Sequence, residues 1–561
     1  MAHSIEAILF DMGGTLRGSV PTSLATQVEK VRQILRMLDS GQSAAALNDL
    51  LTQRFKAYMR WARETLIELD EVSLWTEWML PDWPAGRIAE ISRELNELWR
   101  QATGIRELFP ETKEVVIELF RRGYRLGIVS NTTSSVEVPR TLRALELAGC
   151  FETVILSCEV GIRKPDPAIL LEAARRMEVP PERCAYIGDR LDRDVQSAQR
   201  AGFAKVVIHR YAQDFPRHQS HHPDLIADHY VDDLRQLLAI FPAMPDKREM
   251  KPLFNASLST MWARRNFPRL SDFFEAAGRL GFPRVELNHQ VDSAMLDGTK
   301  LSSQTVSSIH EPCPADISTE ELKERDWLVS SPDEDCRRRG VEAVRRTVDL
   351  ARRLKLAVMV VHCGWVSGDI SWEKKLRSLL EAGQSGSPEY LAVQRDMRAR
   401  RAELIAPRLE AVKRSLIELL ECASGSGLRL GLENRYHFFD IPSPDEMGDL
   451  LALAGPDRLG FVYDVGHAQT LDRLGFYPHE GWLRRFGSRI IETHLHDVIG
   501  VSDHLAPGLG EVDFDMVARY LPAEAVRALE LQPSNTPGQV RDGLRYLAAH
   551  GCIRPATEVP S

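Results

Sequence analysis

Short apolar runs rich in β-branched residues alternate with longer amphipathic stretches through most of this 561-residue chain. Such alternation is typical of α/β proteins, in which parallel strands are joined by helices that cover the sheet. It falls into two series, separated by the proline-containing segment FPAMPDKREMKP at 241–252, which has no period. Since the chain is also too long for one ordinary domain, we predict two α/β domains joined by a linker at 241–250.

The first series predicts a Rossmann-like core, which we place at 1–240, with a helical cap. Strand-like runs lie at 5–10, 124–130, 152–157, 184–188 and 205–209. Between the first two of these runs, over about 17–105, the periodicity is helical, as in QVEKVRQILRML, and no clear strand interrupts it. We therefore predict an all-helical insertion between the first strand and the rest of the sheet.

The second series predicts a closed barrel. Its strand candidates lie at 253–258, 284–288, 307–310, 356–362, 428–433, 459–464, 490–496 and 526–531. Eight strands separated by helical patterns are the number that closes a (β/α)8 TIM barrel. We place this barrel at 251–561, with a long helical stretch at about 371–422 between its fourth and fifth strands.

Composition argues against several kinds of partner. A net charge of −9 opposes bulk attraction to nucleic acid or anionic lipid. No apolar run approaches the ~20 residues that span a bilayer, and the N-terminal sequence lacks the pattern of a secretory signal. The eight cysteines form no C-x-x-C pair. We expect a cytoplasmic protein with reduced thiols that acts on a small molecule, and its oligomeric state stays open.

Four polar motifs follow predicted strands of the first domain, at the sheet edge where α/β proteins bind ligands. Asp11, in DMGGT, can attack phosphorus while backbone amides hold the phosphate oxygens. Ser130 and Asn131 offer small polar donors, and Lys164 in RKPDP can offset negative charge. The acids of GDRLDRD at 188–194 can hold Mg²⁺. Each motif alone is weak, but their order indicates phosphate chemistry.

In this order the motifs resemble the haloacid dehalogenase (HAD) superfamily with a helical cap. The resemblance implies that Asp11 is the nucleophile, that it forms an aspartyl-phosphate, and that Lys164 assists it. The residues expected to bind phosphate are Thr15, Ser130, Asn131 and Lys164. Those expected to bind Mg²⁺ are Asp11, Gly13, Asp189 and Asp194.

Gly13 departs from the HAD pattern. HAD phosphatases usually carry an aspartate at this position as general acid/base, and such a group contributes about 10²–10⁴-fold in rate. The Gly13 carbonyl can reach a metal but cannot transfer a proton. Three alternatives follow: a phosphatase that uses water or substrate as the acid, phosphonate cleavage through a cap lysine (Lys30 or Lys56), or a non-catalytic phosphate-binding domain. We favour phosphate-ester hydrolysis.

Acids and imidazoles end the predicted barrel strands or follow them closely. They are His310, His362, Glu433, Asp464, His467, His494, His496, His504 and Glu530. Because the carboxyl ends of barrel strands share one face, we expect these side chains to converge there. Imidazole and carboxylate donors without thiolates indicate a catalytic site for Mn²⁺, Co²⁺, Zn²⁺ or Mg²⁺. Individually, His310 could be a polar cap and Glu433 an ion-pair partner of Arg435.

The motifs LEN, YDVGH and HLHDVIGVSDHLAPGLGEVDF resemble the xylose isomerase-like barrels, which include sugar isomerases, sugar epimerases and endonuclease IV. The resemblance implies one metal on Glu433, Asp464, His494 and Glu530, with Glu433 or Glu530 moving a carbon-bound proton. Additional metal or substrate contacts are expected from His310, His362, His467, His496 and His504. Two departures are Gly508-Leu509-Gly510 in place of G-E-G, and Ser502 where an aspartate is expected, with Asp503 offset by one.

Together the two halves predict a bifunctional metal-dependent enzyme. One half would be a HAD-type phosphate-ester hydrolase using Mg²⁺, and the other a sugar or sugar-phosphate isomerase or epimerase using a divalent metal. The alternatives are a barrel that is a multi-metal phosphodiester hydrolase of the endonuclease IV type, and a HAD half that is a non-catalytic phosphate-binding scaffold.

Overall fold

The computed structural model describes residues 4–211, 215–244, 254–262, 267 and 269–556. The chain divides into two compact units, made mainly of Met1–Lys247 and of Arg248–Asn535 with Gln539–Ser561. Most of the predicted linker, from 245 onward, lies outside the described residues, as does residue 253 of the first predicted barrel strand.

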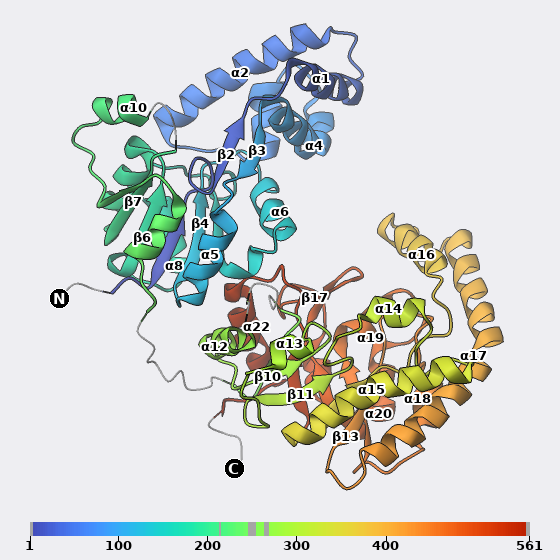
Figure 1. Cartoon of the computed structure of the whole chain (residues 1–561). Coiled ribbons are helices and arrows are strands. Elements are labelled where there is room, and N and C mark those ends of the chain that lie inside the picture. Colours follow the sequence, from blue (N-terminus) through green and yellow to red (C-terminus); the bar gives the residue numbers. More distant parts are fainter. Residues whose placement is uncertain (1–3, 212–214, 245–253, 263–266, 268, 557–561) are drawn as a thin grey trace. The chain divides into compact units, whose positions relative to one another are not determined.

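The first unit is built on a six-stranded parallel sheet with the order β5-β4-β1-β6-β7-β8 (Figure 1). The strands are β1 Ala7–Phe10, β4 Arg125–Ser130, β5 Phe151–Leu156, β6 Cys184–Gly188, β7 Lys205–His209 and β8 His229–Val231. Runs such as AILF in β1 are buried throughout, as expected for strands covered on both faces. The predicted Rossmann-like core is confirmed, whereas the sequence pattern missed β8.

The helices of this core join and flank the sheet strands. They are α5 Thr112–Arg121, α6 Glu137–Ala144, η2 Ala148–Cys150, α7 Ser157–Val160, α8 Ala168–Arg176, η3 Pro181–Arg183, η4 Leu191–Val195, α9 Gln196–Arg200, α10 Phe215–His221, η5 Leu234–Gln236 and α11 Leu237–Ile240. β1 is central, and the chain continues to β4 on one side of it and later to β6 on the other. The strand order therefore reverses beside β1, which is where open α/β sheets bind ligands.

The insertion after β1 is a helical cap on a two-stranded stem. Its helices are α1 Leu24–Leu38, α2 Ala44–Thr65, α3 Glu71–Ser73, η1 Leu74–Met79 and α4 Ala85–Thr103. Ser23 and Ser43 cap α1 and α2 by accepting hydrogen bonds from backbone N–H groups three residues on. The stem pairs β2 Arg17–Val20 with β3 Ile105–Leu108 in antiparallel register, so the chain leaves and re-enters the core at one place.

The second unit is a closed barrel of parallel strands in the order β10-β11-β12-β13-β14-β15-β18-β9. The strands are β9 Ser257–Ser259, β10 Arg284–Leu287, β11 Val306–His310, β12 Val358–Val361, β13 Arg429–Glu433, β14 Leu459–Asp464, β15 Ile490–His494 and β18 Val526–Leu529. The predicted TIM barrel is confirmed. Its first strand begins later than the predicted 253–258. Directly after β15 in the chain, β16 Asp497–Ile499 and β17 Ser502–Leu505 pair as an antiparallel hairpin.

Helices connect the barrel strands. They are α12 Leu270–Leu280, α13 Ser293–Leu296, α14 Thr319–Glu324, α15 Glu334–Leu354, α16 Ser371–Glu381, α17 Pro388–Cys422, α18 Pro444–Leu451, α19 Val465–Arg473, α20 His479–Phe486, η7 Gly487–Arg489, α21 Phe514–Ala518 and α22 Pro537–Ala549. The predicted stretch at 371–422 is two helices, α16 and α17. Gly383 and Gly386 separate them with φ of 70° and 82°, a conformation that favours glycine. In the part of the chain that the structure describes, no helix has the length and apolar character to cross a membrane.

Candidate functional site

Three carboxylates and a lysine meet at the carboxyl edge of the first unit's sheet. Asp11 follows β1 directly, Asp189 follows β6, and η4 carries Asp194. The Nζ of Lys164 lies 2.9 Å from Asp11 Oδ1 and 2.9 Å from Asp194 Oδ1. All four side chains are buried. The structure thus brings together the candidate nucleophile, its lysine and two of the predicted Mg²⁺ ligands.

Lys164 is held rigidly among these acids. Its side chain is fully buried, and its ammonium donates to the carbonyl of Val129 at 3.1 Å and to the hydroxyl of Tyr186. The Lys164 backbone N–H donates to Asn131 Oδ1, and Asn131 Nδ2 donates to the Lys164 carbonyl, both at 2.9 Å. Asn131 was predicted to bind phosphate, but here both ends of its amide fix the loop that carries Lys164.

Arg193 is a central residue that the sequence reasoning missed. Its Nη2 lies 2.7 Å from Asp11 Oδ2, 2.5 Å from Asp189 Oδ1 and 3.1 Å from Asp194 Oδ2. One guanidinium group therefore contacts all three carboxylates. The only signal in the sequence was a basic residue inside an acidic motif, and such a residue more often faces solvent.

The balance of charge at this edge still favours an additional cation. Burial raises the pKa of Asp189 to about 8, and the neighbouring Asp194 and Asp11 carboxylates also raise it. Arg193 acts in the opposite direction. Although burial opposes it, Arg193 and Lys164 hold the pKa of Asp194 below its usual value. Three carboxylates face two cations, and their oxygens are the ligands that Mg²⁺ prefers. Asp11, Asp189 and Asp194 therefore fit a magnesium ion chemically.

The loop after Asp11 leaves room for a ligand. Thr15 is buried, and its Oγ1 has no hydrogen-bond partner among the described residues. Gly14 has φ of 79°, and a Cβ there would lie 2.2 Å from Asp189 Oδ2. At Gly13, by contrast, a Cβ would meet nothing within 4 Å. Ser130 lies buried at the end of β4. An oxyanion could therefore use the Thr15 hydroxyl, and a Cβ at position 13 would be free of clashes.

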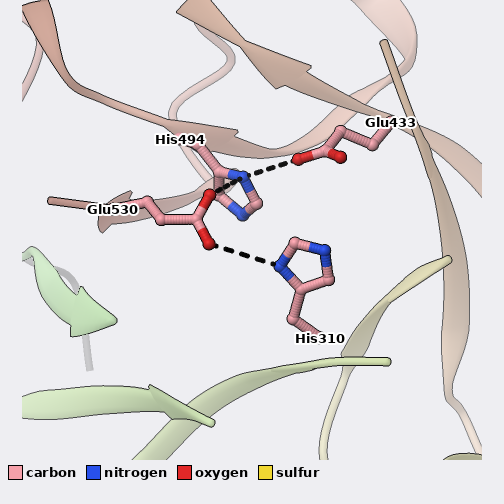
Figure 2. A group of neighbouring side chains, drawn as sticks. All are labelled: His310, Glu433, His494 and Glu530. Atoms are coloured by element: carbon pink, nitrogen blue, oxygen red, sulfur yellow. Dashed lines mark hydrogen bonds and ion pairs between the residues drawn. The ribbon is translucent and has the colours of Figure 1, made fainter. Parts of the chain in front are cut away.

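In the barrel, three carboxylates converge on the imidazole of His494, and Figure 2 shows two of them, Glu433 and Glu530. His494 Nδ1 lies 2.9 Å from Glu433 Oε1, 3.2 Å from Glu530 Oε2 and 3.6 Å from Asp464 Oδ2. Glu433, Asp464 and His494 end β13, β14 and β15, and Glu530 follows β18. All four are buried, so barrel closure brings together the four predicted ligands of the shared metal.

The electrostatics of this cluster suit a cation. Although burial opposes it, Glu286 and Glu530 raise the pKa of His494 well above its usual value. His467, His496 and His494 hold the pKa of Asp464 well below its usual value, also against burial. The buried carboxylates of Glu433, Asp464 and Glu530 therefore favour a positive charge at the position of His494 Nδ1. Carboxylate and imidazole donors fit a divalent ion such as Mn²⁺, Co²⁺ or Zn²⁺.

Glu286 is a second residue that the sequence reasoning missed. It lies in β10, fully buried, and its Oε2 is 3.0 Å from His494 Nε2. A carboxylate on the far nitrogen fixes the tautomer and orientation of a ligating histidine. Glu492 lies beside it, and burial together with Glu286 raises the pKa of Glu492 to about 8. A glutamate inside a buried strand was visible in the sequence, but its partner was not.

His310 and His362 form a second group at the barrel rim. Their Nε2 atoms lie 2.6 Å apart, and His362 Nε2 is 3.3 Å from Glu433 Oε2. Figure 2 also shows His310 facing Glu530, with Nδ1 to Oε1 at 3.6 Å. Burial, with Arg435 and His310 nearby, lowers the pKa of His362 well below its usual value, so this ring is neutral. A neutral imidazole keeps one nitrogen lone pair, which can bind an ion or accept a hydrogen bond from a substrate.

A third group contains His467, Asp503 and His504, with His496 beside it. His504 Nδ1 lies 3.0 Å from Asp503 Oδ1, and His467 Nε2 lies 3.8 Å from Asp503 Oδ2. The His496 ring stacks on the His504 ring, and His496 Nε2 lies 3.0 Å from Asp464 Oδ1. Asp503, which the sequence places one position off the expected aspartate, therefore reaches both histidines of this group.

Glu433 also forms the ion pair that the sequence left open. Arg435 Nη1 contacts Glu433 Oε2, and Arg435 Nε lies 3.8 Å from Asp440 Oδ2. Glu433 thus faces His494 with one oxygen and Arg435 with the other. Glu433 can therefore both belong to the cluster around His494 and form an ion pair with Arg435, because each contact uses a different oxygen atom.

These two arrangements place a cluster of aspartates at the edge of an α/β sheet and a ring of carboxylates and imidazoles at the rim of a barrel. Residues 5–202 match the family model for haloacid dehalogenase-like hydrolases, and residues 274–550 match that for the xylose isomerase-like TIM barrel. The chain belongs to the haloacid dehalogenase-like hydrolases, with a xylose isomerase-like TIM barrel as its second unit.

Relatives of the first unit are phosphatases. A glyceraldehyde 3-phosphate phosphatase of Methanopyrus kandleri is 36% identical over 24% of this chain and 55% of its own length. A phosphoglycolate phosphatase of Shigella boydii serotype 4 is 30% identical over 36% of this chain and 81% of its own length. The chain thus spans little more than half of the first of these relatives.

Among solved structures, a D-tagatose 3-epimerase-like protein is 19% identical and covers 53% of this chain and 96% of its own, with a TM-score of 0.36. A likeness of this size assigns no activity to the barrel.

Proposed function

We propose that the chain is an enzyme with two active sites, which releases phosphate from a small phosphate ester in the first unit and isomerises or epimerises a sugar-like compound in the barrel. The first part is supported by the contact of Asp11 with both Lys164 and Arg193, and by the phosphatase relatives. The second is supported by the convergence of Glu433, Glu530 and Asp464 on His494.

In the first unit, Asp11 would attack the phosphorus atom and form an aspartyl-phosphate, which water then hydrolyses. Lys164 and Arg193 balance the charge of the nucleophile and the phosphate, and the Thr15 hydroxyl is free to hold a phosphate oxygen. A magnesium ion on Asp11, Asp189 and Asp194 would, when bound, offset further negative charge. Because Gly13 carries no acid, the leaving group takes its proton from water or from the substrate.

Phosphate release from a panel of small phosphate esters tests this first activity. The full-length chain, assayed with Mg²⁺, is expected to release phosphate from at least one ester. Release from none of them would contradict the proposal and favour the alternative in which this unit only binds phosphate.

In the barrel, Glu433 and Glu530 lie on either side of His494 Nδ1. One carboxylate would remove a proton from the carbon beside a carbonyl group, and the other would return a proton to the neighbouring atom. A divalent ion held by Glu433, Asp464, His494 and Glu530 would, when bound, act as a Lewis acid on the substrate oxygens. Burial of the cluster keeps bulk water from competing for the proton.

Proton transfer at carbon can be measured directly. In D₂O, the barrel is expected to introduce deuterium at a carbon beside the carbonyl of a substrate sugar, and removal of the metal by a chelator should stop this. The Glu433→Gln variant should exchange about 10²-fold more slowly, since the amide cannot accept the proton. Exchange at an unchanged rate in this variant would rule out Glu433 as the base.

The position of Glu286 gives a prediction about metal affinity. Glu286→Gln should weaken binding of Mn²⁺ or Co²⁺ to the barrel by about 10–100-fold, because the residue orients His494. Titration calorimetry of the full-length chain measures this. Glu342→Gln, at an exposed glutamate on α15, is the matched control and should leave the affinity unchanged. Equal affinities in both variants would contradict the orienting role of Glu286.

A second candidate for the barrel is a multi-metal phosphodiester hydrolase. It is favoured by the facing Nε2 atoms of His310 and His362 and by the group around Asp503, which offer donors for further ions. Against it, Arg435 already contacts the second oxygen of Glu433, which would make that oxygen less available to a further ion. Metal analysis separates the two: one Mn²⁺ or Co²⁺ per barrel supports the isomerase, and three Zn²⁺ support the hydrolase.

A further inference from the structure

A small pocket opens beside the barrel's metal-binding cluster. It has a volume of about 50 Å³ and lies at the ends of β11, β12 and β13, where it is bounded by α14 and α15. His362 and Arg435 line it, and both also contact Glu433 Oε2. The pocket and the proposed proton-transfer site therefore share a wall.

The pocket contains a lysine without an acidic partner. Lys323, on α14, is half-buried, and its ammonium lies 5.4 Å from the centre of the Trp365 ring. Within the described ranges, no carboxylate lies within ion-pair distance of Lys323. A half-buried ammonium group that has no ion-pair partner can form a charge-assisted hydrogen bond with an anionic ligand. None of the steps proposed above uses this charge.

The other charged groups of the pocket are engaged with one another or with the backbone. Arg435 adds a second cation, whose Nε is 3.8 Å from the pocket residue Asp440. Glu311 also lines the pocket, and its Oε1 accepts a hydrogen bond from the backbone N–H of His362. Asp440 therefore offsets Arg435 and Glu311 is bound to the backbone, so Lys323 is the charge left to a ligand.

The shape of the pocket limits what that ligand can be. The rings of Trp327 and Trp365 and the side chains of Leu322 and Val344 form much of its wall. The pocket volume is about 50 Å³. Since one water molecule needs about 10–15 Å³ of cavity volume, the pocket can hold a group the size of a few water molecules. A phosphate or a carboxylate has this size and carries the charge that Lys323 lacks.

We propose that the barrel's substrate carries an oxyanion, which binds in this pocket against Lys323 while the carbonyl end of the same molecule lies at Glu433 and Glu530. The substrate class is then an anionic sugar derivative, either a sugar phosphate or a sugar acid, and not a neutral sugar. This inference rests on the proposed isomerase or epimerase function and names its substrate class.

A heavy phosphate analogue locates the oxyanion directly. Crystals of the full-length chain soaked in tungstate should show the ion within hydrogen-bond distance of Lys323 Nζ. The Lys323→Met variant should lose this ion, and Lys323→Arg, which keeps the charge, should retain it. Lys375→Met is the matched control, because Lys375 is exposed on α16 and pairs with Glu389. Tungstate beside Lys164 in the first unit is the internal reference for the soak.

Deuterium exchange separates the sources of the oxyanion. In the wild type, a sugar phosphate, a sugar acid and a neutral sugar are compared, and the preferred anion identifies the class. Lys323→Met should lower exchange into that anionic compound by about 10–100-fold, as expected for loss of a charge-assisted hydrogen bond, and should leave any exchange into neutral sugars unchanged.

The outcomes distinguish failure of this inference from failure of the proposed function. Tungstate beside Lys164 but not beside Lys323, or exchange into anionic compounds that Lys323→Met leaves unaltered, would overturn the inference. Tungstate in the pocket together with no exchange into any compound would support an oxyanion pocket and overturn the proposed isomerase or epimerase function.

Discussion

Replacing Asp11 by Asn is expected to lower phosphate release from esters by about 10⁴-fold or more, because an amide cannot act as the nucleophile. The variant should keep its fold, since Asp189 and Asp194 remain to pair with Lys164 and Arg193. Loss of one of three carboxylates leaves two acids facing two cations. Initial rates of phosphate release measure the effect, and thermal unfolding checks the fold.

Asp192→Asn is the matched control for this variant. Asp192 lies in the same acidic motif, but its side chain is 47% exposed and makes no contact with Asp11 among the described residues. We expect its phosphate release to stay close to that of the wild type. If Asp11→Asn released phosphate at the wild-type rate, the nucleophile would be a different group and the assignment of this edge of the sheet would be wrong.

Replacing Gly13 by Asp is expected to raise phosphate release by about 10²–10⁴-fold, the usual contribution of a positioned general acid. The backbone admits a side chain here, because a Cβ at Gly13 would meet nothing within 4 Å and the backbone is not left-handed. The new carboxyl group would protonate the leaving oxygen, a task left to water or substrate in the natural chain. The assay is again the initial rate of phosphate release.

Gly13→Asn separates acid catalysis from simple occupation of the space. The two side chains have nearly the same size, but the amide transfers no proton, so Gly13→Asn should show no gain. The gain should also disappear when Gly13→Asp is combined with Asp11→Asn. A Gly13→Asp variant no faster than the wild type would mean that protonation of the leaving group does not limit this site.

Most of the fold could be predicted because parallel strands that are covered on both faces appear as unbroken apolar runs. AILF in β1 and LGFVYD in β14 are examples, and both are buried throughout. The strands that the pattern missed, among them β2, β3 and β8, have only three or four residues and are partly exposed, which is too short for an apolar run or an alternation to be recognised. The break between α16 and α17 was marked by Gly383 and Gly386, but a helical period on both sides hid it.

The convergence of the candidate site residues could be predicted because strand ends share one edge of a sheet or one rim of a barrel. Asp11 and Glu433 are both at such ends, and their catalytic roles stay predictions. Arg193, Glu286 and Lys323 could not be found in this way. Each matters because of where its side chain points and what it meets, and these contacts join segments far apart in the chain.

The antiparallel stem of the cap has a consequence for how such enzymes diversify. Val20 pairs with Ile105, so the two points where the helical insertion departs and returns are adjacent partners in one ladder. A tight hairpin could join them, or an unrelated module could be grafted there, without altering the register of the catalytic sheet. The helical cap can therefore be exchanged in evolution while the segment that carries Asp11 is kept.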